Sequence, residues 1–118
     1  DRHDYPGPSM PKYKNDYRAL VLGEFGGLGL PVEGHTWKEK DNWGYRSYKD
    51  KEELQKAFLA LIEKFPVLIM NGLSAAVYTQ TTDVEIEVNG ILTYDRKIDK
   101  IGSEKVRSEI RKLYGVLK

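Results

Sequence analysis

Apolar residues fall into a few short patterns separated by long polar and glycine-rich stretches. Residues 19–22 and 73–79 are short apolar runs without alternation, which is typical of buried strands in parallel sheets. Residues 54–69 carry apolar side chains at i, i+4, i+7, i+8, i+11, i+14 and i+15, which predicts an amphipathic helix. A last helix, with Ser103 as its N-cap, is predicted from the spacing of Val106, Ile110, Leu113 and Leu117.

Local signals set the ends of the longer helix. Asp50 and Glu53 form a capping-box-like start, because each side chain can accept a hydrogen bond from a free backbone N–H of the first turn. Pro66 lies inside the apolar stripe and is expected to kink the helix, or to end its regular part near Phe65. The Asn71-Gly72 pair is a stop signal.

The connections between these elements are unusual in length and content. Residues 23–47 show neither a helical nor a strand period and hold six glycines with several aromatic side chains. Loops of this length are functional or disordered, and their aromatic content favours function. Residues 85–94 contain Asn89-Gly90, which predicts a hairpin turn or a turn within a long loop. Residues 1–17 are rich in proline, which favours extended or turn backbone, or a frayed end.

The order of the elements is strand, loop, helix, strand, loop, helix. This alternation predicts parallel pairing with right-handed crossovers, and hence an α/β fold. Two such units are too few for a closed barrel, which takes about 250 residues. They would leave open sheet edges and uncovered apolar faces. The predicted fold is therefore a partial (β/α)8 TIM barrel, with residues 1–118 as one piece of a larger domain.

Composition excludes several classes of function. With 19 Lys and Arg against 18 Asp and Glu, the net charge of +1 argues against a nucleic-acid partner. The apolar runs are shorter than the roughly 18 residues that predict a membrane span. The chain has no cysteine and only two distant histidines, so we predict no disulfide, no metal site and no cofactor. The start at Asp1 is interpreted as a processed terminus or as part of a longer chain.

Glu24 is the strongest catalytic candidate, because it directly follows the first apolar run. Catalytic groups of TIM barrels lie at the carboxyl ends of the strands. The alternative is a structural glutamate paired with an arginine. A phosphate loop is not favoured, because no helix follows the glycines directly. Trp37, Trp43 and Tyr45 are candidates for stacking on a sugar ring or for packing the long loop onto the helix.

These residues resemble glycoside hydrolase family 2, which holds β-galactosidases, β-glucuronidases and β-mannosidases. Residues 22–29 (LGEFGGLG), 34–37 (GHTW) and 42–45 (NWGY) are similar to its seventh-strand region. Residues 72–85 (GLSAAVYTQTTDVE), with EVNG and TYDRK after them, resemble the eighth strand and its exit. Residues 1–8 resemble the end of the sixth strand. The resemblance extends to about residue 105 and implies the last two β/α units, strands 7 and 8 with their helices, at the C-terminal end of the catalytic barrel domain.

The resemblance implies specific roles. Glu24 matches the retaining nucleophile, which attacks the anomeric carbon and forms a covalent glycosyl-enzyme. Six residues match positions around the sugar pocket and are the expected substrate-binding residues: His3, Tyr5, Trp37, Trp43, Tyr78 and Asn89. The expected partner is a carbohydrate, and the parent enzyme is compatible with a periplasmic or secreted location.

One departure from the family pattern limits this expectation. The family's acid/base glutamate follows an asparagine, and no Asn-Glu pair occurs here. Retaining glycosidases need two carboxyl groups about 5–5.5 Å apart. The 118 residues alone are therefore expected to be nearly inactive, and to associate with the rest of the parent barrel or with themselves. The alternatives are a non-catalytic module that binds sugar through Trp37, Trp43 and Tyr78, and a structural α/β module.

Overall fold

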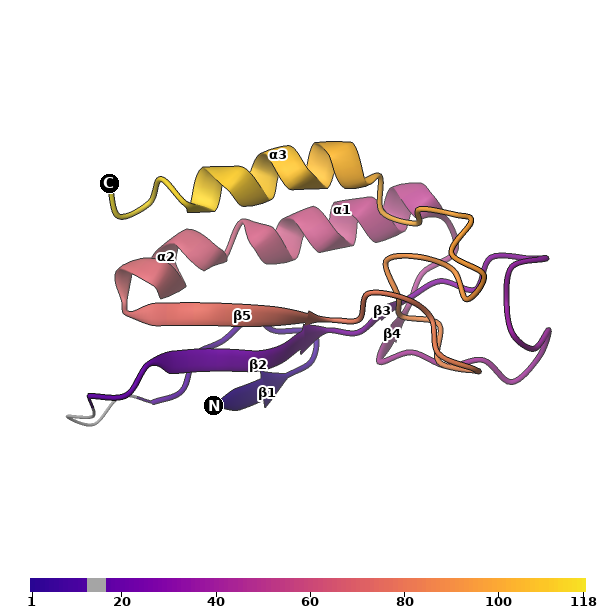
Figure 1. Cartoon of the computed structure of the whole chain (residues 1–118), viewed down its shortest axis with the longest axis horizontal. Helices are drawn as coiled ribbons and strands as arrows, with labels where there is room; N and C mark the ends of the chain where they lie inside the picture. The colour runs from indigo at the N-terminus through magenta and orange to yellow at the C-terminus, as the bar shows by residue number, and fades with distance from the viewer. Residues whose placement is uncertain (13–16) are drawn as a thin grey trace.

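The computed structural model describes residues 1–12 and 17–118 (Figure 1). The elements in these ranges are, in chain order, β1 (Arg2–Asp4), β2 (Leu20–Gly26), β3 (Leu28–Gly29), β4 (Arg46–Ser47), α1 (Lys51–Ile62), α2 (Phe65–Met70), β5 (Leu73–Thr79) and α3 (Ser103–Leu113).

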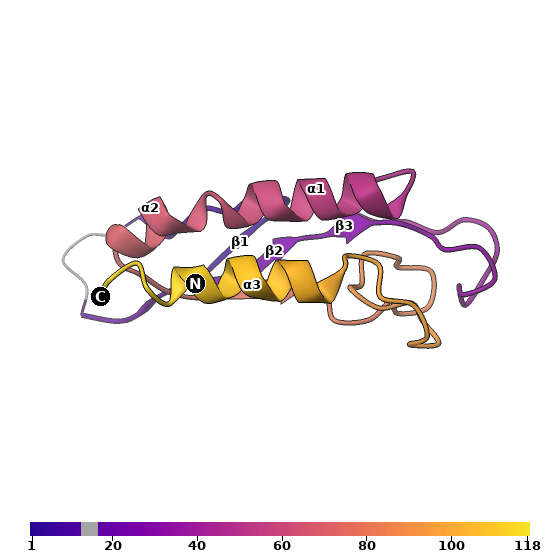
Figure 2. The same cartoon turned by 90° about the horizontal axis from the view of Figure 1, so that it is seen from above.

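The elements form two layers. β1, β2 and β5 make a parallel sheet in the order β1-β2-β5, and the three helices cover one face of it (Figure 1). Seen from above, α3 lies beside α1 (Figure 2). The parallel pairing expected from the sequence is confirmed, and Arg2–Asp4 is a strand rather than a frayed end. The sheet is open, so its place in a (β/α)8 barrel stays a prediction.

Helix α1 follows its sequence signals closely. The Asp50 carboxylate accepts a hydrogen bond from the Glu53 N–H at 2.8 Å, while Glu53 accepts one from Lys49 N–H instead of closing the box on Asp50. Pro66 lies in the first turn of α2, where its missing N–H costs no hydrogen bond, and α1 has already ended at Ile62. The expected end of the regular helix near Phe65 is thus confirmed.

Strand β2 extends beyond the predicted strand. The sequence placed residues 23–26 in a loop, and this was wrong, because β2 continues to Gly26. The central position of β2 explains the extension: Glu24 pairs with His3 of β1, and Phe25 pairs with Tyr78 of β5. Neither pairing is visible in the local sequence. The expected irregular loop also contains two short segments, β3 and β4, which pair in parallel.

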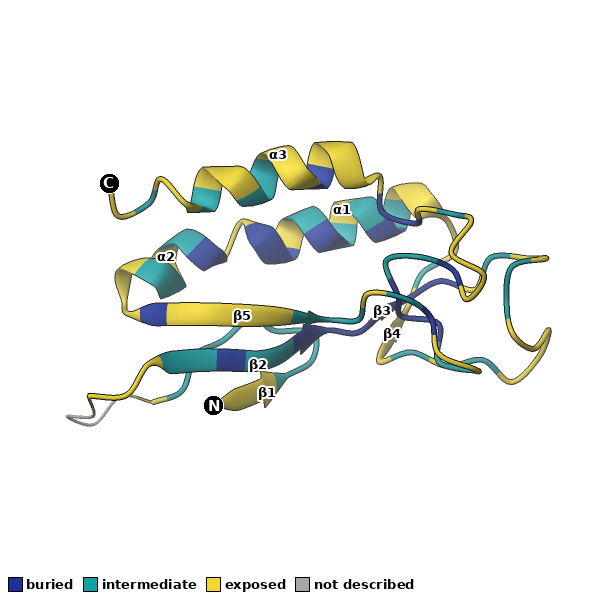
Figure 3. Ribbon diagram, viewed as in Figure 1, coloured by how far each residue is buried: buried dark blue, intermediate teal, exposed yellow. Residues whose placement is uncertain are grey.

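Strand β5 has the predicted bounds but not the predicted burial. Leu73 is its only buried residue, and residues 74–77 are exposed (Figure 3). Among the described residues β5 pairs only with β2, so its other edge carries no neighbour. The open edge expected for an incomplete parallel sheet is therefore present, and the prediction of a buried strand was wrong.

The N-cap of helix α3 is not the predicted residue. Gly102 is the N-cap, with φ of 67°, and Ser103 is already helical. The Asp99 carboxylate accepts hydrogen bonds from the N–H groups of residues 101, 102 and 103, so the capping oxygen comes from a residue farther upstream. Of the predicted apolar stripe, Val106 is buried, whereas Leu117 lies beyond the helix and is 73% exposed.

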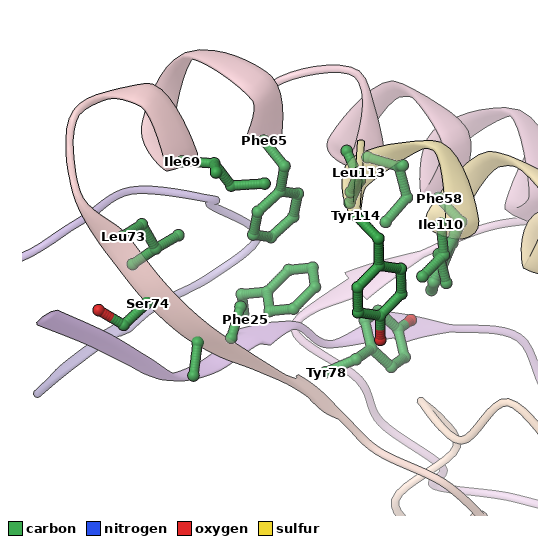
Figure 4. Close-up of a pocket in the computed structure, with 13 residues that line it drawn as sticks. Phe25, Phe58, Phe65, Ile69, Leu73, Ser74, Tyr78, Ile110, Leu113 and Tyr114 are labelled. Carbon is green, nitrogen blue, oxygen red and sulfur yellow. The ribbon is translucent and has the colours of Figure 1, made fainter. Parts of the chain in front are cut away.

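The core lies between the helices and the sheet. Its buried members come from every layer and include Leu22, Phe25, Leu54, Phe58, Leu61, Phe65 and Val106. An apolar pocket of about 250 Å³ remains between β5 and the helices, lined by side chains such as Phe65, Ile69, Leu113 and Tyr114 (Figure 4). The helix-covered face of the sheet is thus mostly apolar.

Candidate functional site

Glu24 lies near the carboxyl end of the central strand, on the face away from the helices. The next residue, Phe25, packs edge-on against Phe65 of α2, with ring centroids 5.0 Å apart. Because successive residues of a strand point to opposite faces, the Glu24 side chain points away from this core. Its side chain is 41% exposed, which leaves the carboxylate accessible to a ligand.

A β-bulge sets the direction of Glu24. Arg2 pairs with Leu22 and His3 with Glu24, so Gly23 is an extra residue in β2. The Gly23 N–H donates to the Asp1 carboxylate at 2.9 Å, and a Cβ on Gly23 would collide with that carboxylate. Bulges of this kind re-aim a side chain and are frequent beside active sites.

Three strand ends contribute groups around the Glu24 carboxylate. The Tyr5 hydroxyl, just after β1, donates to Glu24 Oε2 and also lies 3.3 Å from Thr79 Oγ1 at the end of β5. His3 Nδ1 is 3.6 Å from Glu24 Oε2, and His3 Nε2 is 3.2 Å from Asp1 Oδ2. The structure therefore brings together three of the residues expected from the sequence, Glu24, His3 and Tyr5.

The Tyr5 phenol is held in its protonated form. Burial, followed by the hydrogen bond to Glu24, raises the pKa of Tyr5 well above its usual value. A phenol that keeps its proton remains a hydrogen-bond donor to the carboxylate across the physiological range. Tyr5 thus fixes one oxygen of Glu24 and leaves the other available.

A partly exposed aromatic cluster borders the carboxylate. The rings of Tyr5 and Tyr45 stack with centroids 3.7 Å apart and planes 2° from parallel. Trp43 meets Tyr45 edge-on at 5.4 Å, and Trp43 and Tyr45 are 43% and 46% exposed. Aromatic surface of this kind can pack against the apolar C–H face of a sugar ring.

Two expected pocket residues lie elsewhere. Tyr78 belongs to the helix-covered face, where its ring is 5.4 Å from Phe25 and 4.8 Å from Phe58, and burial raises its pKa. Trp37 lies in the irregular loop between β3 and β4 and is 51% exposed. Within residues 1–12 and 17–118, no ring contact or hydrogen bond joins Trp37 to the Glu24 cluster.

Asn89 is fully buried beside the end of β5. Its backbone and side-chain oxygens each accept a hydrogen bond from Gln80, both at 3.1 Å, whereas its side-chain Nδ2 has no hydrogen-bond partner. The Asn89-Gly90 pair does not form a hairpin. Gly90 is needed instead for close approach, because a Cβ there would collide with the backbone of Thr82 and Asp83. Neither sequence alternative holds for this pair, because the turn of this region lies at residues 85–86, where Val84 and Glu87 exchange backbone hydrogen bonds.

Of the residues that contact Tyr5, the sequence analysis missed Thr79 and named Tyr45 only as a candidate for sugar stacking or loop packing. Thr79 closes the predicted strand, but nothing in its sequence context indicates that its hydroxyl reaches Tyr5. Tyr45 belongs to the aromatic run 43–45, which was a visible signal. Spacing along the chain could not show that Tyr45 stacks on a residue 40 positions away, since that contact depends on how the long loop folds back.

In the described part of the chain, the structure shows neither a metal-ligand cluster nor a helix that could span a membrane. Residues 1–12 and 17–118 contain no cluster of three or more His, Cys, Asp or Glu side chains able to hold a metal ion. None of the described helices combines the length and apolar character needed to cross a membrane.

Comparison with known protein-family models and with curated proteins found no match to this chain. The resemblance to glycoside hydrolase family 2 therefore stays a prediction from the sequence motifs.

Proposed function

We propose that this chain supplies the nucleophile of a retaining glycosidase, and that Glu24 is that nucleophile. The observation that carries the proposal is the position of Glu24 at the carboxyl end of the central parallel strand, with a partly exposed carboxylate beside an aromatic stack. Open α/β sheets and barrels bind their ligands at this edge of the strands.

The contacts of Glu24 suit nucleophilic attack. Oε2 accepts the Tyr5 hydrogen bond, so Oε1 is the oxygen that attacks the anomeric carbon. The C–O bond to the leaving group breaks as the glycosyl ester forms, and water then hydrolyses the ester. Tyr5 and His3 orient the carboxylate, while Tyr45 and Trp43 offer apolar surface to the sugar.

Leaving-group protonation needs a second carboxyl group about 5–5.5 Å from the first. We propose that this group comes from polypeptide outside the 118 residues, in the same barrel. Without it, the loss in rate with a poor leaving group is about 10²–10⁴-fold.

The proposal is tested with a protein that joins these residues to the rest of their barrel. Glu24→Gln should lower hydrolysis of aryl β-glycosides by on the order of 10³-fold or more, because the amide is a poor nucleophile. The matched control is Glu33→Gln, an exposed glutamate on the following loop, which should leave hydrolysis unchanged. Unchanged hydrolysis by the Glu24→Gln protein would reject the assignment.

A second candidate is sugar binding without catalysis, which the exposed Trp43 and Tyr45 rings favour. This alternative requires the 118 residues alone to bind a sugar. Tyr45→Ala should then weaken binding, and Glu24→Gln should leave it unchanged. Titration calorimetry with galactosides, glucosides and mannosides distinguishes the two candidates.

A further inference from the structure

Away from the Glu24 cluster, the chain buries an ion pair between Lys100 and Asp83. Lys100 is fully buried, and its Nζ lies 2.7 Å from Asp83 Oδ1, 2.9 Å from the Val88 carbonyl and 3.0 Å from the Leu30 carbonyl. An ammonium group has three hydrogens, so in the charged form of Lys100 each of them has an acceptor.

Stability alone is a poor explanation for such a pair. Burial raises the pKa of Asp83 and lowers that of Lys100, which means that it disfavours both charges. Apolar residues of similar volume are often as stabilising as a buried ion pair. The contacts of Lys100 with the backbone indicate what the pair does in addition.

Lys100 fastens together the two long loops at the carboxyl ends of the strands. Leu30 belongs to the loop between β3 and β4, whereas Asp83 and Val88 belong to the loop between β5 and α3. The Val88 N–H donates to the Trp43 carbonyl at 2.8 Å, and the Val88 carbonyl accepts from the Leu30 N–H at 2.9 Å. The segment held by Lys100 therefore holds the backbone of Trp43.

The same contacts lead to the candidate nucleophile. Trp43 packs edge-on against Tyr45, Tyr45 stacks on Tyr5, and the Tyr5 hydroxyl donates to Glu24. A continuous path of hydrogen bonds and ring contacts thus connects the buried ammonium with the carboxylate.

We propose that Lys100 is a positioning residue for the Glu24 cluster. Its ammonium, paired with Asp83, fixes the loop segment that places Tyr45 on Tyr5. The value of this placement for catalysis rests on the proposed function, but the placement itself is measurable without any sugar.

The test uses the 118-residue chain with ¹³C-labelled tyrosine. A ring stacked at 3.7 Å shifts the Tyr5 ring resonances upfield, and the spectrum of Tyr5→Phe identifies them. Lys100→Ala should lose at least half of this shift. Lys97 is an exposed lysine of the same loop, and the control variant Lys97→Ala should keep the full upfield shift of Tyr5.

Chemical rescue separates positioning from general destabilisation. n-Propylammonium replaces the three methylenes and the ammonium that Lys100→Ala removes, so it should restore the Tyr5 shift. Tetramethylammonium has the same charge but no N–H donors and should not restore it. A shift that both cations restore equally, or that propylammonium leaves lost in a folded protein, would overturn the proposal.

If Lys100→Ala does not fold, Lys100→Met with Asp83→Asn keeps the volume and removes both charges. This double variant should fold and lose the Tyr5 shift, and retention of the full shift would reject the positioning role. Glu24→Gln could instead leave hydrolysis unchanged while Lys100→Ala still loses the upfield shift of the Tyr5 ring. In that case the proposed function fails and the positioning role stands.

Discussion

The two faces of the central strand β2 differ in burial and polarity: one carries the buried Phe25 and the other the partly exposed Glu24. Phe25 is 4% exposed and packs between the aromatic rings of Phe65 and Tyr78, within a core shared by all three helices. Glu24, the residue before it, is partly exposed and is held by His3 of the neighbouring strand and by Tyr5 just after that strand. The helix-covered face stabilises the fold, whereas the open face arranges polar groups. Substitutions on the two faces should therefore have separable effects.

The largest effect on stability is expected for Phe25→Ala. Removing a buried phenylalanine costs about 3–5 kcal/mol of unfolding free energy, because the cavity closes only in part. Urea unfolding measures this loss. Val77→Ala, on the exposed part of β5, is the control and should cost less than about 1 kcal/mol. A loss below about 1 kcal/mol for Phe25→Ala would contradict the account of the apolar face.

Gly26→Ala should have the next largest effect. Gly26 has φ of 96°, and a Cβ there would overlap the Tyr78 ring. Gly34 has φ of 76° with no atom within 4 Å of its Cβ position, so Gly34→Ala reports the backbone strain alone. We expect a loss of about 1–2 kcal/mol for Gly34→Ala and about 1–3 kcal/mol more for Gly26→Ala. Equal losses in urea unfolding would show that Tyr78 is free to move away.

Two tyrosines allow the faces to be compared by titration. Tyr5 and Tyr78 both have a raised pKa, but Glu24 contributes only at Tyr5, whereas burial is the leading cause at both. Glu24→Gln should therefore lower the pKa of Tyr5 toward its usual value of about 10 and leave that of Tyr78 unchanged. ¹³C NMR of the tyrosine ring carbons as a function of pH measures both groups. A change at both tyrosines, or at neither, would contradict the separation of the faces.

The smallest effect is expected in the loops beyond the sheet. Hydrogen bonds from the Thr93 hydroxyl and from His35 Nδ1, 2.8 Å away, lower the pKa of Asp95 below its usual range. Because the folded pKa is depressed, this contribution to stability is present above the unfolded pKa of about 4 and is lost as pH falls below it. Asp95→Asn should flatten the decline of unfolding free energy below about pH 4. An unchanged slope would mean that this contact does not persist in solution.

The helix-covered face could be predicted from the sequence because its signals are local. The apolar stripe of α1, the Asp50 cap and the stop at Gly72 each depend on neighbours within a few residues. The exposure of β5 and the continuation of β2 through Glu24 depend instead on which strands pair.

The open face could be predicted only in part. The position of Glu24 after an apolar run indicated its place near a strand end, and the resemblance added His3 and Tyr5. The stacking of Tyr45, the approach of Thr79 and the turn of Tyr78 into the core all depend on contacts between distant segments. Likewise, no periodicity marks Lys100 as buried, because its partners are mostly backbone carbonyls.

The most direct test of the central claim is covalent trapping of Glu24. A 2-deoxy-2-fluoroglycoside with a dinitrophenolate leaving group needs no general acid, so its reaction depends on the nucleophile and not on the second carboxyl group. A protein that joins these residues to the rest of the proposed barrel is incubated with galacto-, gluco- and manno-configured reagents, and the tryptic peptide of residues 19–38 is sequenced by mass spectrometry. We expect one glycosyl ester, on Glu24, and none in Glu24→Gln. An ester on Glu33 of the same peptide, or labelling that persists in Glu24→Gln, would contradict the account.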